Sequence, residues 1–119
     1  MKKLLALVTA LVMVFALCSF AVAEDLIKVG FAQVGHESDW RNANTENYKA
    51  VFSAENGFEL SFVDSDNDNA VQIEAVRSFI QQGVDYIIIA PIETAGWDTV
   101  LAEAKDAGIP VIIADRSVD

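Results

Sequence analysis

The stretch Val84–Arg116, VDYIIIAPIETAGWDTVLAEAKDAGIPVIIADR, decides the fold of this chain. Two short apolar runs, Tyr86–Ala90 and Val111–Ala114, flank a segment whose apolar residues recur at helical spacing: Trp97, Val100, Leu101 and Ala104. Gly108 follows that segment, where a helix commonly ends in a left-handed residue. The pattern predicts a strand, a helix and a second, parallel strand. Because both runs are apolar throughout, we expect a parallel sheet with helices on both of its faces.

The residues before this stretch predict two more pairs of a strand and a helix. Leu26–Ala32 alternates as a strand does, and Trp40–Asn56 predicts a helix with an apolar face made of Ala43, Ala50, Val51 and Ala54. Phe58–Val63 alternates strictly, which is typical of a half-exposed edge strand, and Ile73–Ile80 predicts a further helix. The sequence therefore predicts an α/β doubly wound parallel sheet, flavodoxin-like, with strand order 2-1-3-4.

Residues 1–23 are expected to be a secretory signal peptide. Lys2 and Lys3 precede an apolar run, and Ala21-Val22-Ala23 is a small-x-small cleavage site followed by two acids. A retained membrane anchor is one alternative, because a run of this length is long enough to span a bilayer. A lipoprotein acylated at Cys18 is disfavoured, because a large Leu precedes that cysteine. Residues 24–119 are thus expected to form one domain that works in the periplasm or outside the cell.

The charge of the chain argues against nucleic acid as a partner. Eighteen Asp and Glu stand against eight Lys and Arg, which gives a formal net charge of −10 at pH 7. Such a surface repels phosphate backbones, and the sequence contains neither a basic stripe nor a DNA-binding motif.

The loops lack the signatures of cofactor, metal and catalytic sites. Gln33–Ser38 contains neither a dinucleotide-binding motif nor a P-loop, and Ala90 and Pro91 stand where a receiver domain has its phosphoaccepting Asp. The acidic turn Asp64–Asn69 lacks the Gly of an EF-hand loop at the sixth position. With a single His and no catalytic motif, we expect no cofactor, no metal and no catalytic residue, so a secreted enzyme is a disfavoured alternative.

Aromatic and charged residues follow two of the predicted strands. Trp40 and Arg41 follow the first, and Asp115 and Arg116 follow the fourth. Ligands of such sheets bind beyond the carboxyl ends of the strands. A sugar presents C–H faces that lie on aromatic rings and hydroxyls that bond carboxylates and guanidinium groups. The four residues predict a polyol-binding site, with a core Trp, a solvated Arg and a salt-bridged strand end as the structural alternatives.

Several segments together resemble the type I periplasmic sugar-binding proteins of ABC importers, in their ribose- and galactofuranose-binding branch. They are VGFAQVG at 29–35, ESDWR at 37–41, AVRSFIQQGVD at 75–85, IAP at 89–91, GW at 96–97, IPV at 109–111 and DRS at 115–117. The resemblance implies that Trp40, Arg41, Asp115 and Arg116 contact a sugar. Glu37 and Ser38 match the same motif and are expected to contribute to it.

The resemblance also implies a two-lobed protein of which this chain holds the amino-terminal lobe, with the second lobe missing. Members of the family close two lobes over a sugar and deliver it to an ABC permease in the membrane. The expected function is therefore sugar capture for an importer, by a protein that is monomeric when complete. A module that hands sugar to a receptor or kinase is the alternative on the same fold. We also expect an open apolar edge on the fourth strand, at which another chain could pair.

Overall fold

The computed structural model describes residues 25–119, so the expected signal peptide, with Cys18, lies outside the described residues. Its elements, in chain order, are β1 (Ile27–Gln33), α2 (Asp39–Val51), the 3-10 turn η1 (Ala54–Asn56), β2 (Phe58–Asp64), α3 (Asn69–Gln82), β3 (Tyr86–Ile89), α4 (Asp98–Asp106) and β4 (Val111–Ile113). Every helix in this part of the chain is too short or too polar to cross a bilayer.

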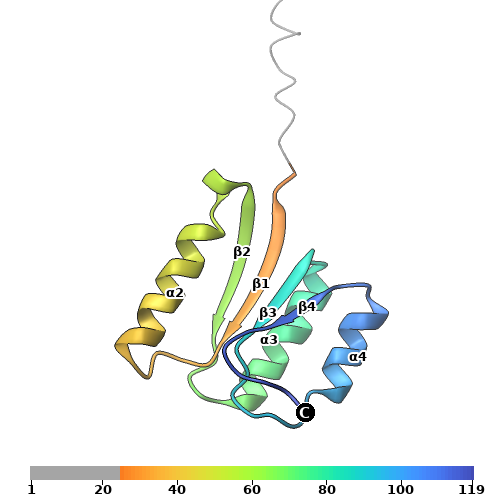
Figure 1. Ribbon diagram of the computed structural model, residues 1–119. Coiled ribbons are helices and arrows are strands. Elements are labelled where there is room, and N and C mark those ends of the chain that lie inside the picture. The colour runs from red at the N-terminus through yellow and green to blue at the C-terminus, as the bar shows by residue number, and fades with distance from the viewer. Residues whose placement is uncertain (1–24) are drawn as a thin grey trace, which may run out of the picture.

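The strands form one parallel sheet in the order β2-β1-β3-β4, as the sequence predicts (Figure 1). In the register of the sheet, Phe31 of β1 stands beside Phe62 of β2 and Ile88 of β3, and Ile88 in turn stands beside Ile112 of β4. The chain leaves β1 in one direction to form β2 and crosses to the other side for β3. The switch point therefore lies between the carboxyl ends of β1 and β3, where ligands of such sheets bind.

Helices pack on both faces of the sheet (Figure 1). On one face, Val76 and Phe79 of α3 and Val100 of α4 are fully buried in a cluster with Ile87 and Ile89 of β3. On the other face, Tyr48 of α2 stacks on Phe31 with 4.2 Å between the ring centroids. Trp97, the first of the apolar residues at helical spacing, is a core residue, with only 2% of its surface exposed.

Gly30 allows α3 to approach the sheet closely. A Cβ atom at this position would lie 2.4 Å from Cγ of Phe79, a distance that real Cβ atoms do not adopt. The ring of Phe79 thus occupies the space that the Cβ atom of any other amino acid at position 30 would need. This contact fixes the depth at which α3 packs against the strand that leads to the candidate site.

The structure corrects the predicted face of the helix that follows β1. Ala43, Ala50 and Val51 are exposed, whereas the inward side of α2 carries Arg41 and Tyr48. The aromatic side chains of β1 and β2 leave room for large partners, which alanines do not fill. The helix also ends at Val51 rather than at residue 56, and the separate turn η1 completes the connection to β2.

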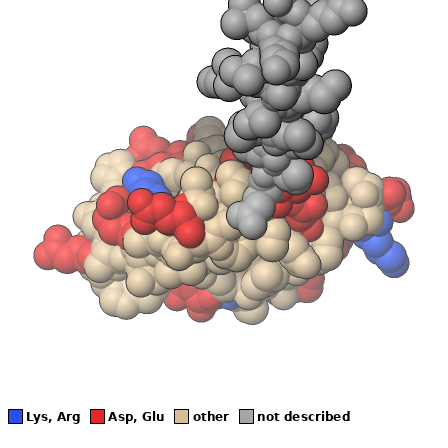
Figure 2. Space-filling view, turned by 90° about the horizontal axis from the view of Figure 1, so that it is seen from above, with Lys and Arg blue, Asp and Glu red and all other residues tan. Residues whose placement is uncertain are grey.

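The predicted coverage of both sheet faces holds for only part of β3 and β4. Ile87–Ile89 is buried, but Tyr86 is 44% exposed and Ile112 is 50% exposed. Both face the side of the sheet on which α2 lies, and α2 packs on β1 and β2 instead. Figure 2 shows the molecule from the end at which the strands begin. The surface on that side carries many acidic side chains and few basic ones. No basic stripe is visible on that end of the described residues.

Candidate functional site

Asp115 turns back toward the end of the sheet immediately after β4. Its backbone is in the left-handed region, with φ of 69°, and the carbonyl of Ala114 accepts a hydrogen bond from the N–H of Arg116 at 2.8 Å. A three-residue turn of this kind is strained for a non-glycine residue, and such strain occurs at ligand-binding sites. The turn is held by the carboxylate, because Oδ2 of Asp115 lies 2.8 Å from Nη2 of Arg41.

Arg41, near the start of α2, is the centre of a buried polar network and is only 3% exposed. Its Nε donates to Oε1 of Glu37 at 2.9 Å, its Nη1 to Oε1 of Gln33 at 3.1 Å, and its Nη2 to Asp115. Burial opposes the charge, but the carboxylates of Glu37 and Asp115 outweigh it and raise the pKa of Arg41 above its ordinary value. A solvated arginine, the alternative interpretation of the sequence, is therefore wrong.

Gln33, the last residue of β1, organises this network and was missed by sequence reasoning. It is fully buried. Its Oε1 accepts from the N–H of Val34 at 3.0 Å as well as from Arg41. Its Nε2 donates to Oδ1 of Asn44 at 3.0 Å and to Oγ1 of Thr45 at 3.1 Å. A glutamine that directly follows the apolar run Val29–Ala32 is the only signal of this role that the sequence offers.

A cavity of about 210 Å³ opens beside the network at the carboxyl ends of β1, β3 and β4. Its walls are formed by Phe31, Trp40, Asn44, Tyr48, Ala90, Ala114 and Asp115. Trp40 is 58% exposed, so it is not a core residue. Its ring lies over the guanidinium of Arg41, with 5.0 Å from Cζ to the ring centroid. Because Trp40, Asn44 and Tyr48 are four residues apart, all three line the cavity from the same side of α2.

The structure brings Trp40, Arg41 and Asp115 together as predicted, and gives Glu37 and Ser38 supporting places. Ser38 caps α2, since its Oγ accepts from the backbone N–H of Arg41 at 3.1 Å. Partial burial would raise the pKa of Glu37, but the hydrogen bond and charge of Arg41 outweigh it and lower that pKa. Arg116 is exposed at the rim, with its Nε 4.0 Å from Oδ2 of Asp115.

His36 forms a second pair at this rim, with its Nδ1 2.9 Å from Oδ2 of Asp64 at the end of β2. The hydrogen bond and negative charge of Asp64, aided by Asp66, raise the pKa of His36. Partial burial would raise the pKa of Asp64, but the N–H of Asp66 and the imidazole outweigh it and lower that pKa. Among residues 25–119, no group of three or more His, Cys, Asp and Glu side chains is placed to hold a metal ion.

The pairing of His36 with Asp64 predicts a measurable pH dependence. The pair with Asp64 raises the pKa of His36, so protonation of His36 stabilises the fold at pH values below the unfolded-state pKa of about 6.5. This contribution is lost as pH rises through the folded-state pKa. Because the pKa of Asp64 is lowered in the folded state, the ionised carboxylate stabilises the fold at pH values above about 3.9. That contribution is lost as pH falls through the folded-state pKa. Because the chain has one His, NMR should show a single imidazole titration with its midpoint above 6.5. Asp64→Asn should lower that midpoint and the distant Glu59→Gln should not; equal midpoints in all three proteins would contradict the pairing.

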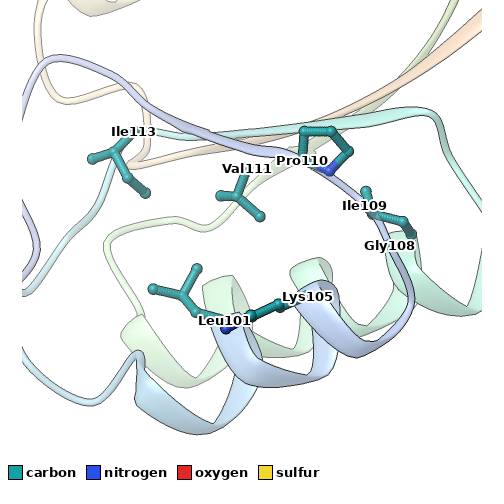
Figure 3. Close-up of a pocket in the computed structure, with 7 residues that line it drawn as sticks. All are labelled: Leu101, Lys105, Gly108, Ile109, Pro110, Val111 and Ile113. Atoms are coloured by element: carbon teal, nitrogen blue, oxygen red, sulfur yellow. The ribbon is translucent and has the colours of Figure 1, made fainter.

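A larger hollow of about 450 Å³ lies away from these groups, between α4 and the outer edge of β4 (Figure 3). Its walls are formed by Leu101, Lys105, Gly108, Ile109, Pro110, Val111 and Ile113. Lys105 is the sole charged side chain among them. This surface lacks the carboxylate and the exposed aromatic ring that the rim provides, so the smaller cavity is the better candidate for binding a polar molecule.

The chain is similar to known proteins of one family. The family model described as a periplasmic binding protein domain matches residues 29–119. A galactofuranose-binding protein from Escherichia coli is 50% identical to the chain over 104 residues, which cover 87% of the chain and 32% of that relative. The chain therefore spans about a third of the length of this relative.

Two solved structures show the same arrangement of the chain with sugars bound. A Mycobacterium smegmatis protein in complex with β-D-fucofuranose is 55% identical, with a TM-score of 0.75 over 78% of this chain and 30% of that one. The periplasmic binding protein of an arabinose ABC transporter from a Shewanella species, bound to α- and β-L-arabinofuranose, is 52% identical. Its TM-score is 0.74 over 77% of this chain and 30% of that one.

Proposed function

The chain belongs to the periplasmic binding protein family, and from this we propose that it forms one wall of a cleft that captures a monosaccharide in its furanose form. The capture serves an ABC importer outside the cytoplasm, and the membrane partner is the permease of that importer. The furanose form is supported by the sugars named for the similar proteins, which are galactofuranose, fucofuranose and arabinofuranose.

The observation that carries the proposal is the pair of Asp115 and Trp40 at one cavity. Oδ2 of Asp115 is taken by Arg41, while its Oδ1 makes no hydrogen bond within residues 25–119. An ionised carboxylate accepts hydrogen bonds only, so Oδ1 is available to a ligand hydroxyl. The exposed indole of Trp40 offers an apolar surface beside it. A sugar ring satisfies both, with a hydroxyl toward the acid and a C–H face toward the ring.

High affinity for the sugar and recognition by the permease depend on contacts that one wall cannot supply alone. A sugar on this wall keeps its other face in water, where those hydroxyls bond to solvent. In a two-walled protein, the sugar stabilises the closed state by its contacts with both walls, and closure presents a new surface to the permease. We accordingly expect millimolar rather than micromolar dissociation constants, about −4 against −8 kcal/mol, for the chain by itself.

Substitution of Asp115 and Arg116 tests the proposal. Asp115→Ala and Arg116→Ala should each weaken sugar binding by more than about tenfold, because each removes a charged hydrogen-bonding group from the rim. Glu59→Ala, which changes an exposed acid of β2, should leave binding unchanged. The measurement is an NMR titration with methyl β-D-galactofuranoside, which is locked in the furanose ring, and with the matching pyranoside. Unchanged affinity in Asp115→Ala would refute the assignment of the site, and equal binding of the two rings would refute the furanose preference.

A further inference from the structure

We infer that Asn44 is a specificity-determining residue, which donates a hydrogen bond from its side-chain amide to a ligand hydroxyl that also bonds to Asp115. The inference rests on the proposed function and adds to it the kind of group that the cavity selects. It begins from Gln33, whose two ends have different chemistry: the oxygen only accepts hydrogen bonds and the nitrogen only donates them.

The orientation of Gln33 is fixed by the backbone. The N–H of Val34 can only donate, and it points at one end of the Gln33 amide at 3.0 Å. Arg41 also only donates, and its Nη1 lies 3.1 Å from the same end. That end must therefore be the oxygen, and the other end must be the nitrogen. A flipped Gln33 would bring donors against donors at two buried contacts.

The orientation of Asn44 follows from that of Gln33. Because Nε2 of Gln33 donates to Asn44 at 3.0 Å, Asn44 must turn its own oxygen toward Gln33. Its amide nitrogen, which carries two N–H groups, then has no hydrogen-bond partner within residues 25–119. Since Asn44 lines the cavity between Trp40 and Tyr48, this nitrogen is available as a donor to a ligand there.

The cavity thus presents a donor from Asn44 and an acceptor from Asp115 to the same ligand. A hydroxyl fits both, because it accepts from one and donates to the other. An ammonium group fails at Asn44, where it meets N–H groups, and a carboxylate fails at Asp115, where two negative charges repel. The remaining wall is mostly apolar, with the rings of Phe31 and Tyr48. The selected ligand is therefore a neutral polyhydroxy compound with one C–H face, and acidic or amino derivatives at that position are rejected.

The test uses the full-length protein and a probe of known structure, methyl β-D-galactofuranoside. On titration, the side-chain amide signal of Asn44 should shift together with the indole signal of Trp40. Asn44→Ala should weaken binding by about five- to tenfold, which is the effect of one lost hydrogen bond. Asn44→Asp should weaken it more, because it replaces the donor by a second acceptor while it still accepts from Gln33. Asn42→Asp, the same change at an exposed position of α2 that does not line the cavity, should leave affinity within about twofold of the unchanged chain.

The outcomes separate the inference from the proposed function. Shifts at Trp40 with a silent Asn44 amide, or equal affinities of Asn44→Asp and Asn42→Asp, would overturn the inference and leave sugar binding intact. Absence of any shift with the furanoside and with the pyranoside would overturn the proposed function, and the inference with it. Coincident shifts and a selective loss in Asn44→Asp would support both.

Discussion

Replacement of Arg41 by Met should lower the free energy of unfolding by about 3 kcal/mol. Met is of similar length and apolar, so the main loss is electrostatic. The side chain of Arg41 is 4% exposed and bonds to three groups, of which Glu37 and Asp115 are charged. Without the guanidinium, both carboxylates stay close together beside a buried glutamine oxygen. Because both retain partial contact with water, the expected loss is at the lower end of the range for a broken buried pair. Urea unfolding of the two proteins measures it.

Arg77→Met is the matched control for this substitution. Arg77 also bonds to two acids, Glu74 on α3 and Glu103 on α4, but its side chain is 35% exposed. Exposed pairs contribute little, so the control should lose far less stability than Arg41→Met. Similar losses in the two variants would show that burial does not set the strength of the Arg41 network.

A double substitution separates the network from the packing of Arg41. If Arg41 acts through Asp115, then Arg41→Met combined with Asp115→Asn should destabilise less than the two single losses added together. Arg41→Met should also abolish sugar binding, because the bond from Arg41 at 2.8 Å is the only hydrogen bond that the Asp115 carboxylate makes within residues 25–119. Additive losses would mean that Arg41 and Asp115 do not act as a pair.

The order of the strands could be predicted because the signals for it are local. Apolar runs such as Tyr86–Ala90, helical spacing and the glycines that end helices all lie within short windows of sequence. The placing of Trp40 and Asp115 at one rim followed from the rule that parallel strands end at the same edge. The two residues meet at one cavity in the structure, although they lie far apart in the chain.

The polar network could not be predicted because its members are specified by partners distant in sequence. Arg41 and Asp115 are 74 residues apart, and nothing near Arg41 marks it as buried. The apolar spacing predicts that alanines and Val51 face inward from α2, because hydrophobicity alone does not distinguish Asn44, which contacts Gln33, from a solvated polar residue. A buried Gln or Asn has no local signature, and its role appears only when its donor and acceptor atoms are paired one by one.

Gln72 is the strongest case of this kind, and its replacement by Met should lower the free energy of unfolding by about 3 kcal/mol. It is fully buried in the first turn of α3. Its Nε2 donates to the carbonyls of Ala32 at 3.2 Å and Ala90 at 2.7 Å, and its Oε1 accepts from the N–H of Ile92 at 2.9 Å. Met fills the same space but pairs with none of these groups.

The three contacts of Gln72 join the ends of β1 and β3 at the switch point, directly behind the cavity that Ala90 lines. Gln72→Met should therefore weaken sugar binding as well as stability. Gln72→Glu keeps the acceptor for Ile92 but sets a carboxyl oxygen against two carbonyls, so its loss of stability should shrink at low pH, where that carboxyl is protonated and can donate. Gln81→Met, at an exposed position of the same helix, is the control. A Gln72→Met protein that is no more destabilised than this control in urea unfolding would contradict the prediction. The carbonyls of Ala32 and Ala90 would then be hydrogen-bonded without Gln72, and the proposed link between β1 and β3 would be disproved.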